Sequence, residues 1–188
     1  DNAVGAGLTQ IQVQSVFDNP DRLKLAIDSI KIVDPNDPTI FNFTPATQSA
    51  QPGNFSFGTF QDPGAVDTTN GNFVINSTQT GEPDPTGGGI GFNGTALDFD
   101  AAETKLVVEA KLLPGNTATG FDIILNDLDG DDSGPGLGSD EYFFTFDAAD
   151  FNETDFVTVE LQLGTGSETG VRNTFGFTNG GNGLQDFD

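Results

Sequence analysis

The sequence predicts an all-β fold, an antiparallel β-sandwich formed as a single domain over residues 1–188. Apolar residues alternate with polar ones over short segments, which is the pattern of a half-buried strand. Clusters of Gly, Pro, Asn and Asp separate these segments and favour turns. Many short strands with frequent turn signals are typical of a sandwich, and 188 residues suit one such domain.

The first elements lie between residues 8 and 33. Segment 8–17 alternates Ile and Val with glutamine, which predicts a strand. Leu23, Leu25 and Ile27 share one face, whereas Ile30 and Ile32 fall on the opposite parity. This change of phase near Asp28–Ser29 predicts either a β-bulge or a strand that passes from one sheet to the other.

Five further short strands are predicted by pairs of apolar residues: Phe41 and Phe43, Phe55 and Phe57, Phe73 and Ile75, Ile90 and Phe92, Leu97 and Phe99. Three segments rich in Pro, Gly, Thr and Asn are predicted to be surface loops: 45–54, 61–72 and 77–89.

The second half alternates more regularly. Its predicted strands are 106–112, 121–125, 142–146, 157–163 and 171–177. The only helical signal is a single turn at Ala148–Phe151. Most of the 18 phenylalanines are expected to fill a core that has neither Met nor Trp.

Composition excludes several functions. The formal charge of -23 comes from 29 acidic and six basic residues, so the surface repels nucleic acid and anionic membranes and attracts divalent cations. No run of apolar residues is long enough to insert into a membrane. Histidine and cysteine are absent, which removes the commonest catalytic bases and nucleophile–base pairs. We therefore predict no catalytic residues and no enzyme activity.

Residues Asn126–Glu141, NDLDGDDSGPGLGSDE, place six acids and four glycines between two predicted strands. The spacing Asp129-x-Asp131-x-Ser133-Gly134-x5-Asp140 resembles the calcium-loop template D-x-[DN]-x-[DN]-G-x5-E. Alternating oxygen ligands, a glycine at the bend and a closing carboxylate suit Ca2+. Because the flanking segments are strand-like, the prediction is a strand–loop–strand calcium site, with a solvated acidic hairpin as the alternative.

Two ligand sets fit this loop. The first uses the side chains of Asp129, Asp131 and Ser133, the carbonyl of Pro135, and Asp140. The second uses Asp127, Asp129 and Asp131, with Glu141 returning from the next strand. Asp129 and Asp131 belong to both sets.

From Gly89 onward the chain resembles a β-jelly-roll module of bacterial extracellular proteins that is similar to carbohydrate-binding modules. The segments that carry the resemblance are GFNGTALDFDAAETKLVVEAKLLPGN, GFDIILNDLDGDDSGPGLGSDEYFFTFDAADFN, FVTVELQL and GNGLQDFD. The resemblance implies a sandwich of jelly-roll type in an extracellular or cell-surface protein, often one of several modules and sometimes stabilised by calcium.

The resemblance also implies one more strand after GLQDFD, where this sequence stops at Asp188. A sandwich without that strand would leave unpaired backbone groups. The uncharged segment LTQIQVQSVF (8–17) has a suitable pattern to fill the position, and residues 2–17 have no charged side chain to protect a strand edge. Residues 1–20 would then pair within their own chain, or act as a donor strand for a neighbouring subunit.

Two functions follow as expectations. The first is a non-enzymatic structural module of an extracellular filament or surface matrix, in which copies of this chain join head to tail by β-strand addition. The alternative is a carbohydrate-binding module with a polysaccharide partner. Sugar platforms favour Trp and Tyr, and this chain has no Trp and a single tyrosine, Tyr142, within a strand of core-like spacing.

Overall fold

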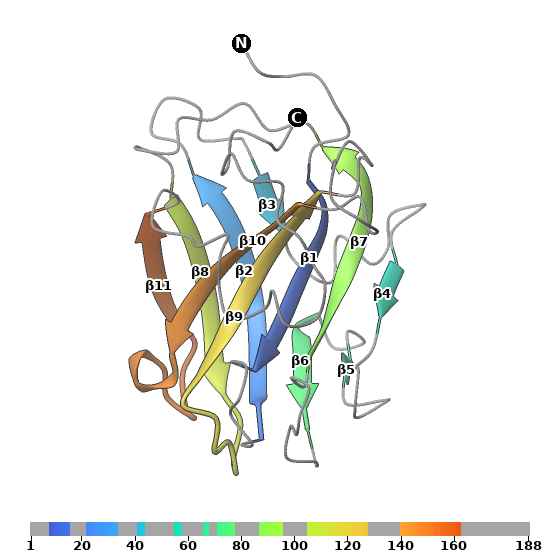
Figure 1. Cartoon of the computed structure of the whole chain (residues 1–188). Helices are drawn as coiled ribbons and strands as arrows, with labels where there is room; N and C mark the ends of the chain where they lie inside the picture. Colours follow the sequence, from blue (N-terminus) through green and yellow to red (C-terminus); the bar gives the residue numbers. More distant parts are fainter. Residues whose placement is uncertain are drawn as a thin grey trace.

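The computed structural model describes residues 8–15, 22–33, 41–43, 55–57, 66–67, 71–77, 87–95, 105–127 and 140–162. They form two antiparallel sheets and one turn of 3-10 helix, η1 (Ala148–Asp150), which confirms the all-β prediction and the single helical turn (Figure 1). The five-stranded sheet has the order β10 (Asp140–Asp147), β9 (Gly120–Asp127), β1 (Leu8–Ser15), β7 (Gly87–Thr95) and β4 (Phe55–Phe57). The six-stranded sheet has the order β11 (Val157–Gln162), β8 (Lys105–Leu112), β2 (Lys24–Val33), β6 (Phe73–Asn76) and β5 (Val66–Asp67), with β3 (Phe41–Phe43) paired to the later part of β2.

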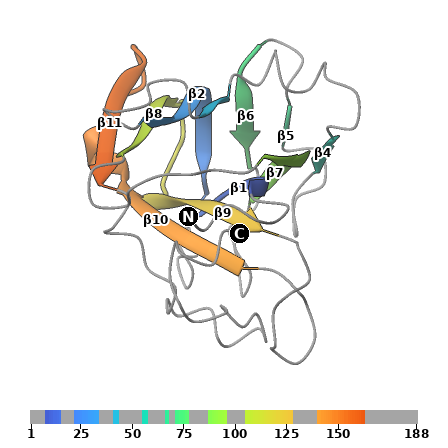
Figure 2. The ribbon, with the colours of Figure 1, turned by 90° about the horizontal axis from the view of Figure 1, so that it is seen from above.

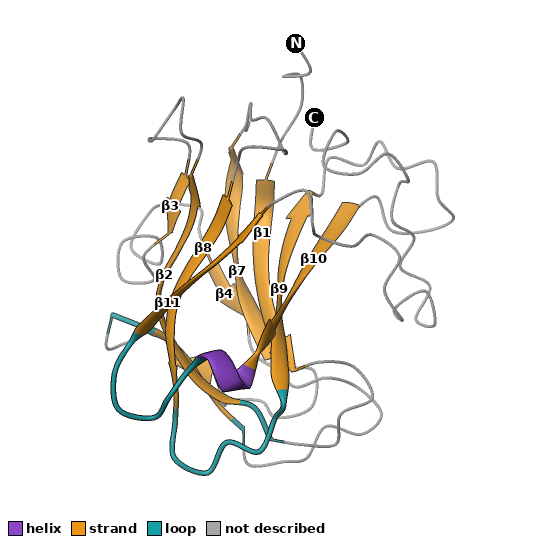
Figure 3. Ribbon diagram, turned by 90° about the vertical axis from the view of Figure 1, so that its left-hand side faces the viewer, coloured by secondary structure: helices purple, strands orange, loops and turns teal. Residues whose placement is uncertain are grey.

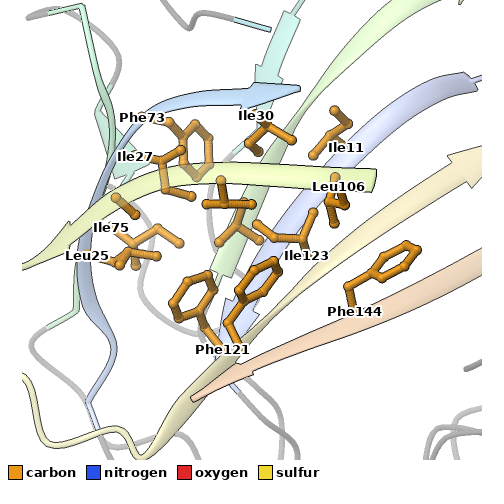
Figure 4. Close-up of a cluster of buried hydrophobic side chains, with 14 of the residues drawn as sticks. Ile11, Leu25, Ile27, Ile30, Phe73, Ile75, Leu106, Phe121, Ile123 and Phe144 are labelled. Carbon is orange, nitrogen blue, oxygen red and sulfur yellow. The ribbon is translucent and has the colours of Figure 1, made fainter. Parts of the chain in front are cut away.

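The two sheets face each other as two layers, with the core between them (Figure 2). The five-stranded sheet contributes Ile11, Phe121 and Ile123, and the six-stranded sheet contributes Ile30 and Leu106, all at most 2% exposed (Figure 4). Burial of each such side chain contributes about 1.5–3 kcal/mol to stability. Among the described residues, no helix is long and apolar enough to cross a membrane.

A β-bulge in β2 explains the change of phase in its sequence. The register of β2 against β8 shifts between Ile27 and Ser29, which confirms the bulge. Because β2 pairs with β8 on both sides of this shift, the strand stays in one sheet, and the alternative of a strand changing sheets is wrong. The bulge returns Ile30 and Ile32 to the core face, where both are at most 1% exposed.

Two segments predicted as loops contain strand residues. Val66–Asp67 forms β5 within 61–72, and Gly87–Gly89 begins β7 within 77–89. Glycine has low intrinsic strand propensity, so the composition of Gly87–Gly89 does not indicate a strand. These residues form one because they pair with β1. The predicted loop 45–54 and the predicted strands at Leu97–Phe99 and 171–177 lie outside the described residues.

Two described connections cross between the sheets at one end of the molecule, residues 112–119 and residues 147–155 (Figure 3). We call this the crossover end, and it also contains residues 22–24, where β2 begins. The link from β8 to β9 is bonded to the start of β2. The Leu113 amide donates to the Lys24 carbonyl at 2.9 Å, and the Thr117 and Ala118 amides both donate to the Arg22 carbonyl at 3.1 Å. These bonds satisfy backbone groups that a crossing segment would otherwise leave unpaired.

Aromatic packing closes the same end. The rings of Phe121 and Phe146 stack with centroids 5.3 Å apart, and Phe151 lies 5.3 Å from Phe121 in a tilted arrangement. Phe151 follows η1, whose N-cap Asp147 accepts a hydrogen bond from the Ala149 amide at 2.8 Å. The sharp return from β10 toward β11 is therefore fixed by both capping and ring contacts.

Candidate functional site

The opposite end of the molecule, which we call the acidic end, contains the tip of the β9–β10 hairpin. Asp127 is the last residue of β9 and Asp140 the first of β10, and the two are directly paired in register. Glu141 pairs with Asn126 in the next row. The strand–loop–strand setting predicted for the acidic loop is therefore confirmed for its two flanks.

Four of the predicted calcium ligands are not positioned by these strands. Asp129, Asp131, Ser133 and Pro135 belong to segment 128–139, which lies outside the described residues. Across the part of the chain that the structure describes, no group of three or more acidic side chains is close enough to hold a metal ion. The described backbone brings together Asp127 and Asp140, which belong to different ligand sets, so the choice between the two sets stays a prediction.

Like charges directly opposite one another destabilise an antiparallel pair, and Asp127 and Asp140 are such a pair. A divalent cation held at this tip would offset the repulsion. The hairpin thus places two carboxylate-bearing residues at the mouth of the loop whose remaining acids complete the predicted calcium site.

The predicted donor strand, β1, lies in the middle of the five-stranded sheet. It pairs with β9 from Leu8 to Ser15 and with β7 from Leu8 to Gln14, both antiparallel. Its register shifts between Leu8 and Gln10 against both neighbours, which marks a bulge near the acidic end. Within this one chain β1 is therefore paired with its own sheet, and exchange between chains stays a prediction.

Leu8 lies where the predicted donor strand meets the predicted calcium loop. It pairs with Asp127, which in turn pairs with Asp140. The first residue of β1 and the mouth of the acidic loop thus occupy one row across three strands. Sequence spacing alone gives no indication of this arrangement, because it depends on which strands are neighbours.

A row of polar residues crosses the same three strands nearer their middle, with Gln14 and Asp122 buried and Thr145 exposed. Asp122 is fully buried and accepts a hydrogen bond from the Thr145 hydroxyl at 2.6 Å. It pairs in register with Gln14, which is 4% exposed. The sequence signal for this row is the single acid within the apolar segment FDIIL, which the alternation pattern treats as an ordinary outward position.

Asp122 lies on the face of the sheet opposite the core, and so does Ile124. Ile124 is 1% exposed and does not belong to the core cluster. On this outer face Asp122 and Ile124 are therefore both covered, whereas Thr145, which pairs with Asp122, is exposed. Tyr142 pairs in register with Leu125, which belongs to the core cluster.

Comparisons of the chain with protein families, with curated proteins and with solved structures found no match.

Proposed function

We propose that this chain is a non-enzymatic structural module of an extracellular filament or surface matrix, with a sandwich of jelly-roll type. Its copies join head to tail by β-strand addition, and calcium in the acidic loop stabilises them. The observation that carries the proposal is the place of β1, an uncharged strand at the centre of a sheet whose two neighbours, β7 and β9, lie far from it in the sequence.

The pairing of β1 supports strand addition because all of it is long-range. Among the described residues, β1 makes no ladder with β2, the strand that follows it in sequence order. An identical strand from another copy would offer the same backbone groups to β7 and β9. In strand addition, these backbone hydrogen bonds provide affinity and the alternate side chains provide specificity.

The burial of β1 shows which contacts a strand from a second copy would have to restore. Ile11 and Val13 are both 2% exposed and pack within the core cluster. An empty position between β7 and β9 would expose this apolar surface and the backbone groups of two strands. A copy whose own β1 is undocked would therefore be stabilised by binding a strand of the same pattern, because that strand buries the exposed apolar surface and pairs the backbone groups.

Charge supports the calcium part of the proposal. The chain carries a formal charge of -23, and the acidic loop concentrates six acids in sixteen residues between Asn126 and Glu141. Binding of a cation to the folded state alone stabilises that state by mass action, by about 2.7 kcal/mol when the free ion is at about a hundred times its dissociation constant.

Light scattering over a range of protein concentrations, followed by negative-stain imaging, tests the assembly. We expect particle mass to increase with concentration and elongated filaments to form in the presence of calcium. A uniformly monomeric sample at every concentration would contradict strand addition, and closed dimers without filaments would contradict head-to-tail growth.

Thermal unfolding with calcium and with chelator tests the metal site. The double variant Asp129→Ala/Asp131→Ala is expected to reduce the calcium-dependent shift in melting temperature to near zero. The matched control Asp150→Ala/Glu153→Ala removes two exposed acids at the crossover end, and it should keep the shift. Identical melting curves of the native chain in calcium and in chelator would rule out the calcium site.

A further inference from the structure

The two strands that flank β1 differ in what they offer to it. On the β9 side, the five side chains from Phe121 to Leu125 are each at most 1% exposed. On the β7 side, the sequence GGGIGFNGT has five glycines in nine residues, and Gly87, Gly88 and Gly89 pair with Gln14, Val13 and Gln12. Glycine-rich strands specify register weakly and are associated with strand exchange, whereas a strand with buried side chains specifies it strongly.

The sequence of β1 has one register that suits the β9 side. Val13 pairs with Ile123 and Ile11 pairs with Leu125, and all four side chains belong to the core cluster. A slip of one residue would turn the glutamines toward the core and move Ile11 and Val13 to the outer face. A slip of two residues would keep the faces but replace one of the two apolar core side chains with that of Thr9 or Ser15.

We infer that the position between β7 and β9 accepts β1 of a second copy of this chain in the register that β1 has within one chain. This inference rests on the proposed strand addition and adds the receiving position, the register and the strand that fixes it. β9 selects the register through Ile123 and Leu125, while the glycines of β7 admit the incoming strand without side-chain obstruction. The partner is thus a second copy of this chain, recognised by the pattern Ile-x-Val at residues 11–13.

Disulfide cross-linking can read this register directly, because the chain has no native cysteine. Gln12 and Ile124 are directly paired. Residues directly opposite in an antiparallel pair have Cα atoms about 4.5–5.5 Å apart, within the span of about 4.4–6.8 Å that a disulfide needs. A tagged full-length Q12C chain and an untagged I124C chain would be unfolded, mixed, refolded together at increasing concentration and oxidised.

The expected result is a covalent heterodimer that holds one chain of each kind. The off-register control mixes Q14C with I124C, whose positions are diagonal neighbours about 7–8 Å apart, and it should give at least tenfold less heterodimer. In the double variant Q12C/I124C, oxidised at low concentration, the disulfide should form within one chain. That disulfide would hold β1 in its own sheet, so assembly should be lost and should return on reduction.

The outcomes separate this inference from the function on which it rests. Filaments without the Q12C–I124C heterodimer would overturn the position between β7 and β9 while leaving strand addition at another edge. Equal yields from the Q12C and Q14C mixtures would overturn the fixed register. An intrachain disulfide in the double variant, together with neither heterodimer nor filaments from the native chain, would overturn both.

Discussion

The crossover end and the acidic end of the molecule are held together in different ways. At the crossover end, the Leu113 amide donates to the Lys24 carbonyl, and the Thr117 and Ala118 amides donate to the Arg22 carbonyl. The rings of Phe121, Phe146 and Phe151 pack together at the same end. At the acidic end, the register sets Asp127 opposite Asp140 at the mouth of a loop rich in acids. The crossover end is therefore held by hydrogen bonds and aromatic contacts, whereas the acidic end concentrates negative charge.

This difference indicates where stability depends on conditions. Hydrogen bonds of the kind found at the crossover end contribute about 0.5–1.5 kcal/mol each and are insensitive to calcium. Opposed carboxylates cost free energy that salt or a bound cation can reduce. We therefore expect variants at the crossover end to change the free energy of unfolding equally with and without calcium, and variants at the acidic end to change it unequally.

The largest effect is expected for Phe121→Ala at the crossover end. Phe121 is fully buried and contacts the rings of Phe146 and Phe151. Its truncation should lower the free energy of unfolding by about 3–5 kcal/mol. Denaturant unfolding in calcium and in chelator should give the same loss, because distant sites are additive.

Phe121→Leu is the matched control, since it keeps most of the buried apolar volume and removes the ring contacts. It should cost clearly less than Phe121→Ala. A loss that differs between calcium and chelator by more than the error of the measurement would show that the two ends are not independent.

Gly115→Ala addresses the link from β8 to β9 and should cost about 1–2 kcal/mol, because φ at Gly115 is +83°, in the left-handed region. The cost is conformational rather than steric, since the nearest atom to an added Cβ would be Lys24 Cδ at 3.9 Å. Gly115→Asn should cost less, because Asn tolerates this region. Equal losses for the two variants, measured by denaturant unfolding, would contradict backbone strain as the cause.

The parts of this fold that the sequence predicts are those set by local pattern. The bulge near Ser29 follows from the change of apolar phase, and the strands that flank the acidic loop follow from alternation on both sides of it. The place of β1 does not follow, because alternation shows that a segment is a strand and not which strands it joins. The strand at Gly87–Gly89 also escapes prediction, since tertiary pairing overrides the low strand propensity of glycine.

The candidate site likewise has a part that the sequence predicts and a part that depends on tertiary structure. Template spacing predicts the acidic ligands, and the register of β9 and β10 then adds the opposition of Asp127 and Asp140. The buried carboxylate of Asp122 is indistinguishable in the sequence from an exposed one, because its burial depends on what covers the outer face of the sheet.

A smaller effect is expected at the turn after η1. The Asn152 side-chain oxygen accepts hydrogen bonds from the amides of Thr154 and Asp155 and from the Thr154 hydroxyl, all at 2.8 Å. Asn152→Ala should cost about 1 kcal/mol, which corresponds to a fall of roughly 2–4 °C in melting temperature for a chain of this size. Asn152→Asp keeps the acceptor and should remain close to the native melting temperature; a fall as large as that of the alanine variant would assign the effect to something other than these bonds.

The smallest effect, and the one that reverses sign, is expected at the acidic end. Asp127→Asn and Asp140→Asn each remove one charge from the same cross-strand pair. In chelator, each should therefore raise the free energy of unfolding by a similar amount, about 0.2–1 kcal/mol, and added salt should reduce the gain. Asp150→Asn, an exposed acid at the crossover end, removes the same charge without relieving this pair and should give less.

The stabilities of Asp127→Asn and Asp140→Asn should differ in calcium, because Asp127 belongs to one predicted ligand set and Asp140 to the other. With saturating calcium, the variant that removes a ligand should become less stable than the native chain, while the other should keep its small gain. Loss in Asp127→Asn would select the set with Glu141, and loss in Asp140→Asn would select the set with Ser133 and the Pro135 carbonyl. Equal gains in calcium and in chelator for both variants would mean that neither carboxylate binds the ion, and that the mouth of the loop is held only by its neighbouring strands.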